Sequence, residues 1–434
     1  VPTKDYVKWF RNSAPYINAH RGKTFVLMFS GEAVAHPNFA NIIHDIALLN
    51  SLGVKLILAH GARPQIEERA TLRGIESRFK DDVRITDSQA LDCVKDAAGS
   101  LRAHIEALLT MGLANSPMHG SQIRVRSGNF IVAKPIGVVD GVDYEHTGIV
   151  RRVDREGIEK QLADGSIVLL SPTGYSPTGE VFNLSHQDVA TETAMTLKAD
   201  KLIVFSEQNG LLNSKGKLIQ NCEVKAVQQL ADRCDDKQTA LLLKTIISSI
   251  ENGVSRCHCV SYIDDGALLQ ELFTRDGAGT LISQNHYERL RAATIEDVGG
   301  ILELIEPLEA AGTLVKRSRE LLENEINQFT VIERDGMVVA CAALYSHKGI
   351  QSGEIACVAT HPDYRGEDRG ERLLAALELQ AKKIRLKSVF VLTTQTAHWF
   401  QELGYVETSR DTLPEQKQTP YNLQRNSKVF IKRL

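Results

Sequence analysis

A strand-like segment in the last third of the chain leads into a turn that carries several arginines and ends at a glycine. The strand runs from Gly353 to Thr360, and the turn from Arg365 to Gly370 precedes a helical stretch. Backbone N–H groups freed in such a turn, together with the helix dipole, suit a pyrophosphate. Arg365, Arg369 and Arg372 add positive charge there. An ordinary strand-turn-helix with solvated arginines would show the same pattern, so the surrounding residues must decide.

The order strand, His-Pro-x-Tyr-Arg-Gly, helix, strand and Phe-x-x-x-Gly-Tyr resembles the GCN5-related N-acetyltransferase family, from about Leu290 to Leu434. That family's pyrophosphate motif, Gln/Arg-x-x-Gly-x-Gly/Ala, is matched by Arg365 and Gly370, whereas Asp368 replaces the first glycine. The resemblance implies an α+β fold and acetyl-CoA as co-substrate. It implies main-chain contacts to the coenzyme from Cys357 and Val358. It implies further coenzyme contacts from the turn and the helix start, at Arg365, Asp368, Arg369, Gly370, Glu371 and Arg372.

Amine acetylation needs a base for the ammonium proton and a proton donor for the departing thiolate. Glu354 stands where this family often carries a catalytic glutamate, and apolar neighbours would raise its pKa. An exposed strand residue is the alternative reading of Glu354. The family's usual acid, a tyrosine, is replaced by Phe400, which leaves Thr393, Thr394 or a water as substitutes.

Two basic segments of this region indicate the charge of the acceptor. They run from Gly312 to Ser318 and from Tyr421 to Lys428. Cations converging from both would suit a dicarboxylate, because arginine pairs bidentately with a carboxylate. Taken singly, each segment is more often a solvated face. The candidate acceptor-binding residues are Lys316, Arg317, Arg425 and Ser427.

The first part of the chain alternates apolar strand-like runs with helical stretches. Such a pattern indicates a doubly wound parallel sheet covered on both faces, an α/β fold. The pattern changes between Gly277 and Asn285. We therefore expect an N-terminal helix in residues 1–22, an α/β domain in 23–283 and an α+β domain in 288–434. The expected strands are Thr24–Phe29, Val54–Ala59, Phe130–Ala133, Ile167–Leu170 and Lys201–Phe205.

Several segments between Lys23 and Ile282 resemble the amino-acid kinase family, and acetylglutamate kinase in particular. They are Leu56–Ile66, Arg84–Asp87, Ala199–Phe205 and Glu271–Thr280. The kinases' first strand usually ends in Lys-x-Gly-Gly, whereas this one ends Met28-Phe29-Ser30-Gly31-Glu32. Without that lysine, phosphoryl transfer loses an electrostatic contribution that it needs. The domain is expected to be a kinase fold retained for another use.

A kinase-like domain joined to an acetyltransferase resembles the bacterial N-acetylglutamate synthase family, as does the segment Tyr144–Gly148. The resemblance implies direct acetyl transfer from acetyl-CoA to L-glutamate, the first step of arginine biosynthesis. It also implies feedback inhibition by L-arginine at the kinase-like domain, and no metal. The histidine, glutamate and glycine spacing of arginine-sensitive relatives, with a lysine from the neighbouring strand, is carried over to Lys201, His258, Glu271 and Gly277.

The N-terminal segment places Tyr6, Trp9 and Phe10 at helical spacing, and Pro15 is expected to close the helix. Packing on its own domain is the simplest fate of this apolar stripe. The resemblance implies instead a contact between subunits of a hexamer. Two other functions stay open: an active amino-acid kinase with an acetyltransferase-like appendage, and a non-catalytic arginine sensor.

Composition limits the partners. With 51 Lys and Arg against 54 Asp and Glu in 434 residues, the net charge is −3, so no global field attracts nucleic acid or an anionic membrane. The longest apolar run, Met337 to Tyr345, is far shorter than the ~20 residues of a membrane span. Seven cysteines without a zinc-like spacing indicate reduced thiols and a cytoplasmic location.

Overall fold

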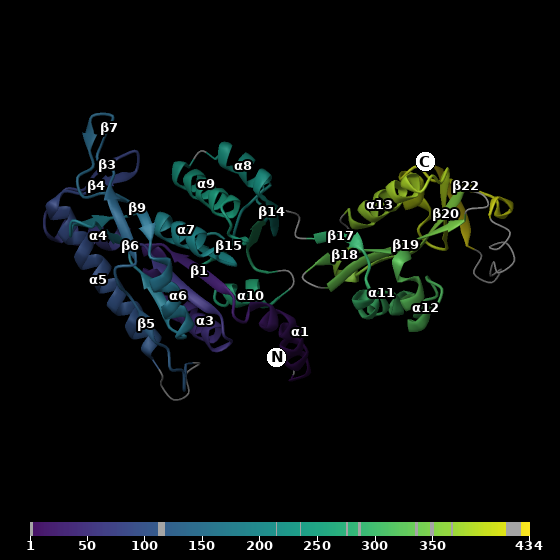
Figure 1. Cartoon of the computed structure of the whole chain (residues 1–434), viewed down its shortest axis with the longest axis horizontal. Coiled ribbons are helices and arrows are strands. Elements are labelled where there is room, and N and C mark those ends of the chain that lie inside the picture. Colours follow the sequence, from purple (N-terminus) through teal and green to yellow (C-terminus); the bar gives the residue numbers. More distant parts are fainter. Residues whose placement is uncertain are drawn as a thin grey trace. The chain divides into compact units, whose positions relative to one another are not determined.

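The computed structural model describes residues 3–111, 118–213, 215–234, 236–274, 277–284, 288–334, 337–347, 351–365, 368–413 and 427–434. The chain forms two compact units, Val1–Asn285 (unit 1) and His286–Leu434 (unit 2), which are described separately (Figure 1).

Unit 1 is built on an eight-stranded sheet of order β14-β16-β15-β13-β1-β2-β10-β5. Its neighbours pair in parallel except β15 and β16, which are antiparallel. The strands are β1 (Thr24–Phe29), β2 (Lys55–His60), β5 (Val125–Arg126), β10 (Ile167–Leu170), β13 (Lys201–Ser206), β14 (Asn221–Glu223), β15 (Arg256–Ser261) and β16 (Thr280–Ser283).

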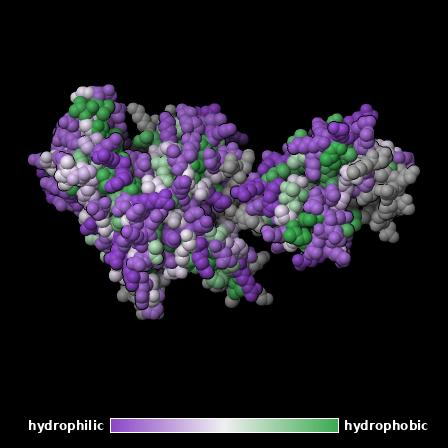
Figure 2. Space-filling view, in the orientation of Figure 1, coloured by the Kyte–Doolittle hydropathy of each residue, from purple (hydrophilic) through white to green (hydrophobic). Residues whose placement is uncertain are grey.

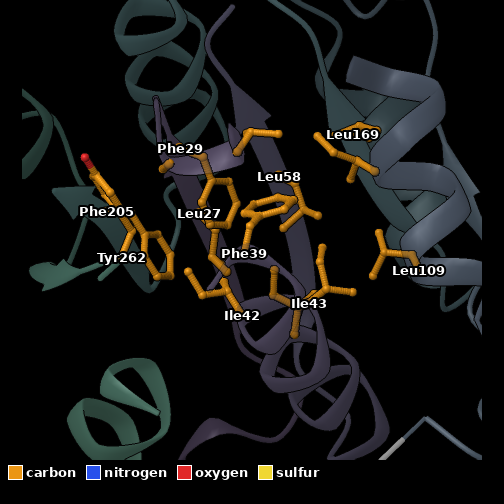
Figure 3. Close-up of a cluster of buried hydrophobic side chains, with 14 of the residues drawn as sticks. Leu27, Phe29, Phe39, Ile42, Ile43, Leu58, Leu109, Leu169, Phe205 and Tyr262 are labelled. Atoms are coloured by element: carbon orange, nitrogen blue, oxygen red, sulfur yellow. The ribbon is translucent and has the colours of Figure 1, made fainter. Parts of the chain in front are cut away.

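Helices cover both faces of this sheet (Figure 1). They are α1 (Thr3–His20), α2 (Gly31–Ala35), α3 (Phe39–Ser51), α4 (Arg63–Leu72), α5 (Ser88–Thr110), α6 (Arg155–Ala163), α7 (His186–Leu197), α8 (Val224–Asp232), α9 (Lys237–Glu251) and α10 (Ala267–Phe273). Alternate residues of β1 enter two cores: Leu27 and Phe29 pack with α3 and α5, and Met28 packs with α7 and α9 (Figure 3). Full burial of one such side chain stabilises the fold by about 1.5–3 kcal/mol.

The Phe130–Ala133 run does not join the main sheet. It forms β6 (Ile131–Pro135) in a second, four-stranded sheet of order β12-β11-β6-β9. Burial along β6 alternates before it ends at Lys134 and Pro135, so only one of its faces is covered. The other strands of this sheet are β9 (Gly148–Val153), β11 (Thr173–Tyr175) and β12 (Val181–Asn183).

Two hairpins complete unit 1. They are β3 (Arg78–Lys80) with β4 (Val83–Ile85), and β7 (Val138–Val139) with β8 (Val142–Asp143). The second hairpin exposes its valines to solvent, Val138 by 67%, at an apolar patch on the surface (Figure 2).

Helix α1 continues past Pro15 to His20, so the expected end at the proline is wrong. The missing N–H of Pro15 costs stability, but the last turn is held by other contacts. Tyr16 and Ile17 pack on the core, and the His20 imidazole hydrogen-bonds the Leu272 carbonyl at 2.8 Å. Phe10 is 56% exposed, whereas the side chains of Tyr6 and Trp9 lie outside the described residues.

Unit 2 is a seven-stranded sheet of order β17-β18-β19-β20-β21-β23-β22. The strands are β17 (Glu288–Ala292), β18 (Phe329–Arg334), β19 (Met337–His347), β20 (Ser352–Thr360), β21 (Ser388–Thr393), β22 (Val406–Thr408) and β23 (Lys428–Arg433). The helices are η1 (Ile295–Asp297), α11 (Val298–Ala310), α12 (Arg319–Glu325), η2 (Ile326–Gln328), η4 (Pro362–Tyr364), α13 (Arg369–Lys383), α14 (Ala397–Glu402) and η5 (Arg410–Thr412).

The two faces of this sheet carry separate cores. One core packs against α13 and α14, the other against α11 and α12. Among the helices that the structure describes, none combines the length and the apolar character needed to cross a membrane.

Candidate functional site

Strands β20 and β21 of unit 2 start as parallel partners and then separate. They pair only from Ser352 to Ile355 on β20 and from Ser388 to Val391 on β21. Further along, β20 pairs with β19 and β21 pairs with β23. From Ala356 onward, the β20 backbone groups that face β21 are therefore available to another extended chain, in the part of the sheet that the structure describes.

A β-bulge lies where the strands separate. The register between β19 and β20 shifts between Cys341 and Ala343, so that two residues, Cys357 and Val358, oppose Ala342. Cys357 has a φ of 54°, a conformation that is strained for a residue with a Cβ and is found at functional sites. The bulge turns the Cys357 side chain into the core beneath α11, while Val358 packs on the opposite face.

Glu354 lies three residues before the bulge and is buried, so the alternative of an exposed strand residue does not hold. On the sheet it has Tyr345 on one side and Phe390 on the other. Its Oε2 atom is 3.8 Å from His347 Nε2, at ion-pair rather than hydrogen-bond distance. A carboxylate in such surroundings is placed to accept a proton from a group entering the gap between the strands.

Of the four residues predicted to bind the acceptor, Arg317 is brought to this region. It follows α11 and is half-buried. Burial lowers the pKa of Arg317, but the neighbouring Cys357 and Tyr345 side chains outweigh this and hold it above its ordinary value. Lys316 is exposed and Ser427 is half-buried just before β23, whereas Arg425 lies outside the described residues.

The predicted pyrophosphate turn leads into α13, and the residue before the helix is Asp368. Gly370 packs against Trp399, since a Cβ there would lie 2.8 Å from the indole. The Arg369 side chain is buried and donates to Glu288 from Nε at 2.7 Å. Arg372 also donates to Glu288, at 3.1 Å. Both guanidinium groups are therefore held by a carboxylate of this unit, while the first backbone N–H groups of α13 face the turn.

The remaining residues predicted for coenzyme binding lie at the surface, and the residue at the position of the family's proton donor is buried. Arg365 and Asp368 are exposed, and Glu371 is exposed in the first turn of α13. Phe400 is buried in the core between the rings of Trp399 and Tyr405. Tyr345 and His347, which lie beside Glu354, were not predicted from the sequence. Their signal was polar residues at the end of an otherwise apolar strand.

Unit 1 brings together the residues predicted for an effector. His258 Nδ1 is 2.6 Å from Glu271 Oε1, and its Nε2 is 3.0 Å from Lys201 Nζ. Because an ammonium group only donates, Nε2 accepts and the Nδ1–H donates to Glu271. Burial, and then the Lys201 charge, lowers the pKa of His258 to about 4, so the imidazole is neutral at physiological pH.

The Glu271 carboxylate is the centre of this cluster. Its Oε2 accepts from the backbone N–H groups of Ala278 at 2.9 Å and Gly279 at 2.8 Å. Burial opposes ionisation, but the hydrogen bonds from His258 and from these amides hold the pKa of Glu271 below its ordinary value. Gly277 has a φ of 67°, and a Cβ there would lie 2.4 Å from Oε2. Only a glycine lets this loop wrap the carboxylate so closely.

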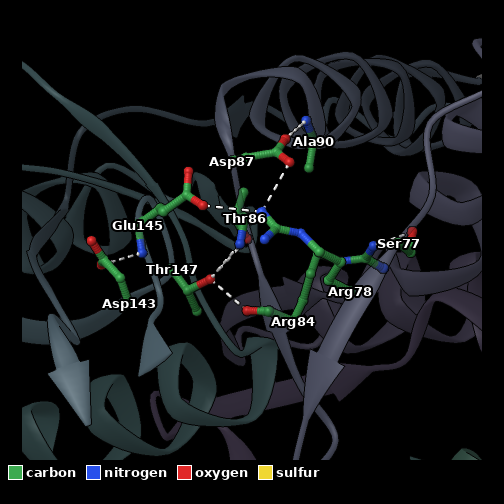
Figure 4. Close-up of polar contacts among 9 residues, drawn as sticks. All are labelled: Ser77, Arg78, Arg84, Thr86, Asp87, Ala90, Asp143, Glu145 and Thr147. Carbon is green, nitrogen blue, oxygen red and sulfur yellow. Dashed lines mark hydrogen bonds and ion pairs between the residues drawn. The ribbon is translucent and has the colours of Figure 1, made fainter. Parts of the chain in front are cut away.

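Two other segments singled out in the sequence also meet. Thr147 Oγ1 accepts from the Thr86 N–H at 3.1 Å and donates to the Arg84 carbonyl at 2.6 Å (Figure 4). Glu145 accepts from Arg78 at 3.0 Å. These contacts join the β3–β4 hairpin and Thr86, which follows it, to the loop before β9.

The edge where a kinase would hold phosphate has a different chemistry. The ends of β1 and β2 lie side by side, since the N–H of Gly61, just after β2, donates to the carbonyl of Phe29 at the end of β1 at 2.7 Å. Glu32 follows in α2. His60 is buried against Ser171 at 3.0 Å, and burial lowers its pKa to about 4. An acid and a neutral imidazole thus stand near the end of β1, where kinases use a lysine.

Comparison with known proteins agrees with this architecture. Residues 23–261 match the amino acid kinase family, and residues 325–407 match the acetyltransferase (GNAT) domain family. The fold, with the separating strands of unit 2, therefore defines a GNAT-type acetyltransferase that carries an amino-acid-kinase unit. The amino-acid acetyltransferases of Ectopseudomonas mendocina (strain ymp) and Azotobacter vinelandii are each 56% identical to the chain, covering 99% of it and 100% of their own length. The chain belongs to the amino-acid acetyltransferase (N-acetylglutamate synthase) family and is an amino-acid N-acetyltransferase.

Solved structures extend the comparison. The crystal structure of N-acetylglutamate synthase from Neisseria gonorrhoeae complexed with coenzyme A and L-arginine has a TM-score of 0.90 and 36% identity, covering 99% of both chains. The same enzyme complexed with coenzyme A and N-acetyl-glutamate has a TM-score of 0.63 and 37% identity, with the same coverage. The expected amino-acid kinase and acetyltransferase folds are both confirmed.

Proposed function

We propose that the chain uses acetyl-CoA to acetylate the α-amino group of L-glutamate directly, giving N-acetyl-L-glutamate and CoA. The observation that carries the proposal is the buried Glu354 at the point where β20 and β21 separate. A pantetheine arm that pairs with the exposed β20 edge would bring its thioester beside this carboxylate. The Neisseria gonorrhoeae enzyme, which shares the fold over its whole length, was crystallised with coenzyme A.

In the proposed reaction Glu354 takes a proton from the substrate ammonium, directly or through a water. The amine lone pair attacks the thioester carbonyl, a C–N bond forms, and the C–S bond breaks as the thiolate leaves. The second proton of the former amine passes to the departing thiolate, directly or through a water, so that CoA leaves as its thiol. Backbone N–H groups near Cys357 and Val358 contact the pantetheine arm. The first N–H groups of α13 hold the pyrophosphate, as a helix N-terminus does for anions. Arg365, Asp368, Arg369, Gly370, Glu371 and Arg372 shape that turn, and Lys316, Arg317, Arg425 and Ser427 bind the substrate carboxylates.

Unit 1 is proposed to hold the regulatory site. L-Arginine would bind there and inhibit the enzyme, as a feedback inhibitor of arginine biosynthesis. The Glu271 carboxylate would pair with the guanidinium, the strongest pairing available to that group. Lys201 would face the carboxylate of the effector, and His258 and Gly277 would fix Glu271. The Neisseria gonorrhoeae enzyme was also crystallised with L-arginine, which supports this assignment. The regulatory domain is accordingly proposed to span residues 23–283, after an N-terminal helix in 1–22, and the catalytic domain to span 288–434.

The assembly and location are part of the same proposal. Helix α1 is proposed to contact other subunits of a hexamer through its exposed Phe10. All seven cysteines are free thiols, which agrees with a cytoplasmic site of action.

The test is product formation by the purified full-length chain. With acetyl-CoA and L-glutamate, and without ATP, we expect CoA thiol and N-acetyl-L-glutamate in equal amounts, identified by mass spectrometry, and a lower rate when L-arginine is added. Thiol release that does not depend on L-glutamate, or product that requires ATP, would contradict the proposal.

A further inference from the structure

Arg317 is held by a set of contacts that the sequence did not reveal. Its backbone N–H donates to Glu309 Oε1 at 2.8 Å, which ties the loop after α11 to that helix. Its Nη1 donates to the Val315 carbonyl at 3.1 Å. The next residue, Ser318, caps α12 by accepting from the Leu321 N–H at 3.2 Å. The loop is thus anchored on both sides. One guanidinium N–H donor binds the Val315 carbonyl, so most of the five can be aimed at another partner.

Tyr345 lies beside this guanidinium. It is directly opposite Glu354 in the β19–β20 pairing, and its hydroxyl donates to Glu325 Oε2 at 2.6 Å. Burial, and then this hydrogen bond, raises the pKa of Tyr345, whereas the neighbouring Arg317 lowers it. The hydroxyl proton is committed to Glu325, so the phenol oxygen keeps only its lone pairs for other partners. The Arg317 guanidinium lies close enough to be stabilised by both this oxygen and the Glu325 carboxylate.

This arrangement distinguishes acidic from neutral acceptors. A guanidinium fixed on one side presents its other edge as a pair of parallel donors, the geometry that matches a carboxylate. A neutral amide offers one acceptor oxygen, which leaves a desolvated donor unsatisfied. A site built to satisfy such groups rejects the analogue that lacks the partner.

We propose that Tyr345 and Glu325 are positioning residues that orient Arg317 toward a carboxylate of the acceptor and so set the preference for an acidic amino acid. This inference rests on the proposed function. It adds two residues of α12 and β19 to the site, neither of which needs to touch the reacting atoms.

The test is steady-state kinetics of the full-length chain with L-glutamate and L-glutamine as competing acceptors. For Tyr345→Phe we expect KM for L-glutamate to rise about tenfold, equivalent to about 1.4 kcal/mol, with kcat changed by less than about threefold. The kcat/KM ratio of L-glutamate over L-glutamine should fall by a similar factor. Glu325→Ala should reproduce the effect, and Glu325→Gln, which keeps an acceptor oxygen, should restore part of the ratio.

The matched control is Glu323→Gln on the same helix, whose carboxylate pairs with the exposed Arg319 at 2.8 Å. Its kinetics should match those of the unaltered chain. Equal loss of kcat/KM for both acceptors in Tyr345→Phe, or no change in their ratio, would overturn the inference and leave the acetyltransferase activity standing. If the unaltered chain does not acetylate L-glutamate at all, it is the proposed function that fails.

Discussion

Glu271 is the residue at the centre of the proposed effector site. It receives an imidazole N–H and two backbone N–H groups, and it stays ionised in spite of burial. A buried charge that is already hydrogen-bonded can bind a guanidinium without first being reorganised. At neutral pH the adjacent imidazole adds no charge of its own, so the pairing is between Glu271 and a cation alone.

Glu271→Gln removes this charge and should weaken inhibition by L-arginine. A charge-assisted hydrogen bond contributes about 1.5–3 kcal/mol, so the arginine concentration for half inhibition should rise at least about tenfold. It is measured by thiol release across an arginine titration. Glu251→Gln, at the exposed end of α9, is the control. An unchanged arginine response in Glu271→Gln would remove the effector site from this cluster.

The sequence predicted this cluster better than it predicted the acceptor site. The resemblance to arginine-sensitive relatives named His258, Glu271 and Gly277, which lie close together in the chain on one strand, the next helix and a glycine loop. Tyr345 and Glu325 are brought to Arg317 by the strand register and by the packing of α12. Nothing in a single sequence fixes either of these.

Among the elements, long apolar strands were predicted nearly to the residue and irregular ones were not. Thr24–Phe29 is β1 as expected, since both its faces are buried. The bulge at Cys357 depends on pairing with β19 and carries no composition signal. The Phe130–Ala133 run resembled a buried strand locally, but its antiparallel partner β9 placed it in the second sheet.

Two helical glycines, Gly370 in α13 and Gly299 in α11, differ in what an added side chain would meet, and this gives a paired prediction. In Gly370→Ala the new Cβ meets the Trp399 ring at 2.8 Å, so the start of α13 must shift. We expect KM for acetyl-CoA to rise about tenfold or more, because overpacking costs about 1–3 kcal/mol and displaces the turn. Gly299→Ala in α11 meets nothing within 4 Å and should stabilise the fold by up to ~1 kcal/mol. Kinetics and thermal unfolding of both variants measure this. An unchanged KM for acetyl-CoA in Gly370→Ala would contradict the role of the turn.

At the scale of the whole molecule, acid should act on unit 1 through its buried histidines. Burial, the largest cause in each case, lowers the pKa of His20, His60 and His258 from 6.5 to about 4. The unfolded chain therefore binds protons first as the pH falls. Stability from these neutral imidazoles is present above pH 6.5 and is lost as the pH falls toward 4.

Each of these histidines should cost unit 1 about 2 kcal/mol of unfolding free energy at pH 5 relative to pH 7.5. Scanning calorimetry of the full chain at both values should show the unit 1 transition shifting to lower temperature. His60→Gln, which does not titrate in this range, should have a shallower pH dependence. A unit 1 transition that does not move between pH 7.5 and pH 5 would contradict the neutral state of these side chains.

Glu354, at the separation of β20 and β21, is proposed to be the base for acetyl transfer to L-glutamate. The most direct measurement is kcat for CoA release by Glu354→Gln, with Glu323→Gln as control. We expect a fall of about 10²–10⁴-fold in kcat, with KM for acetyl-CoA little changed and the unaltered rate in the control. A Glu354→Gln enzyme that keeps its full kcat would show that Glu354 is not the base.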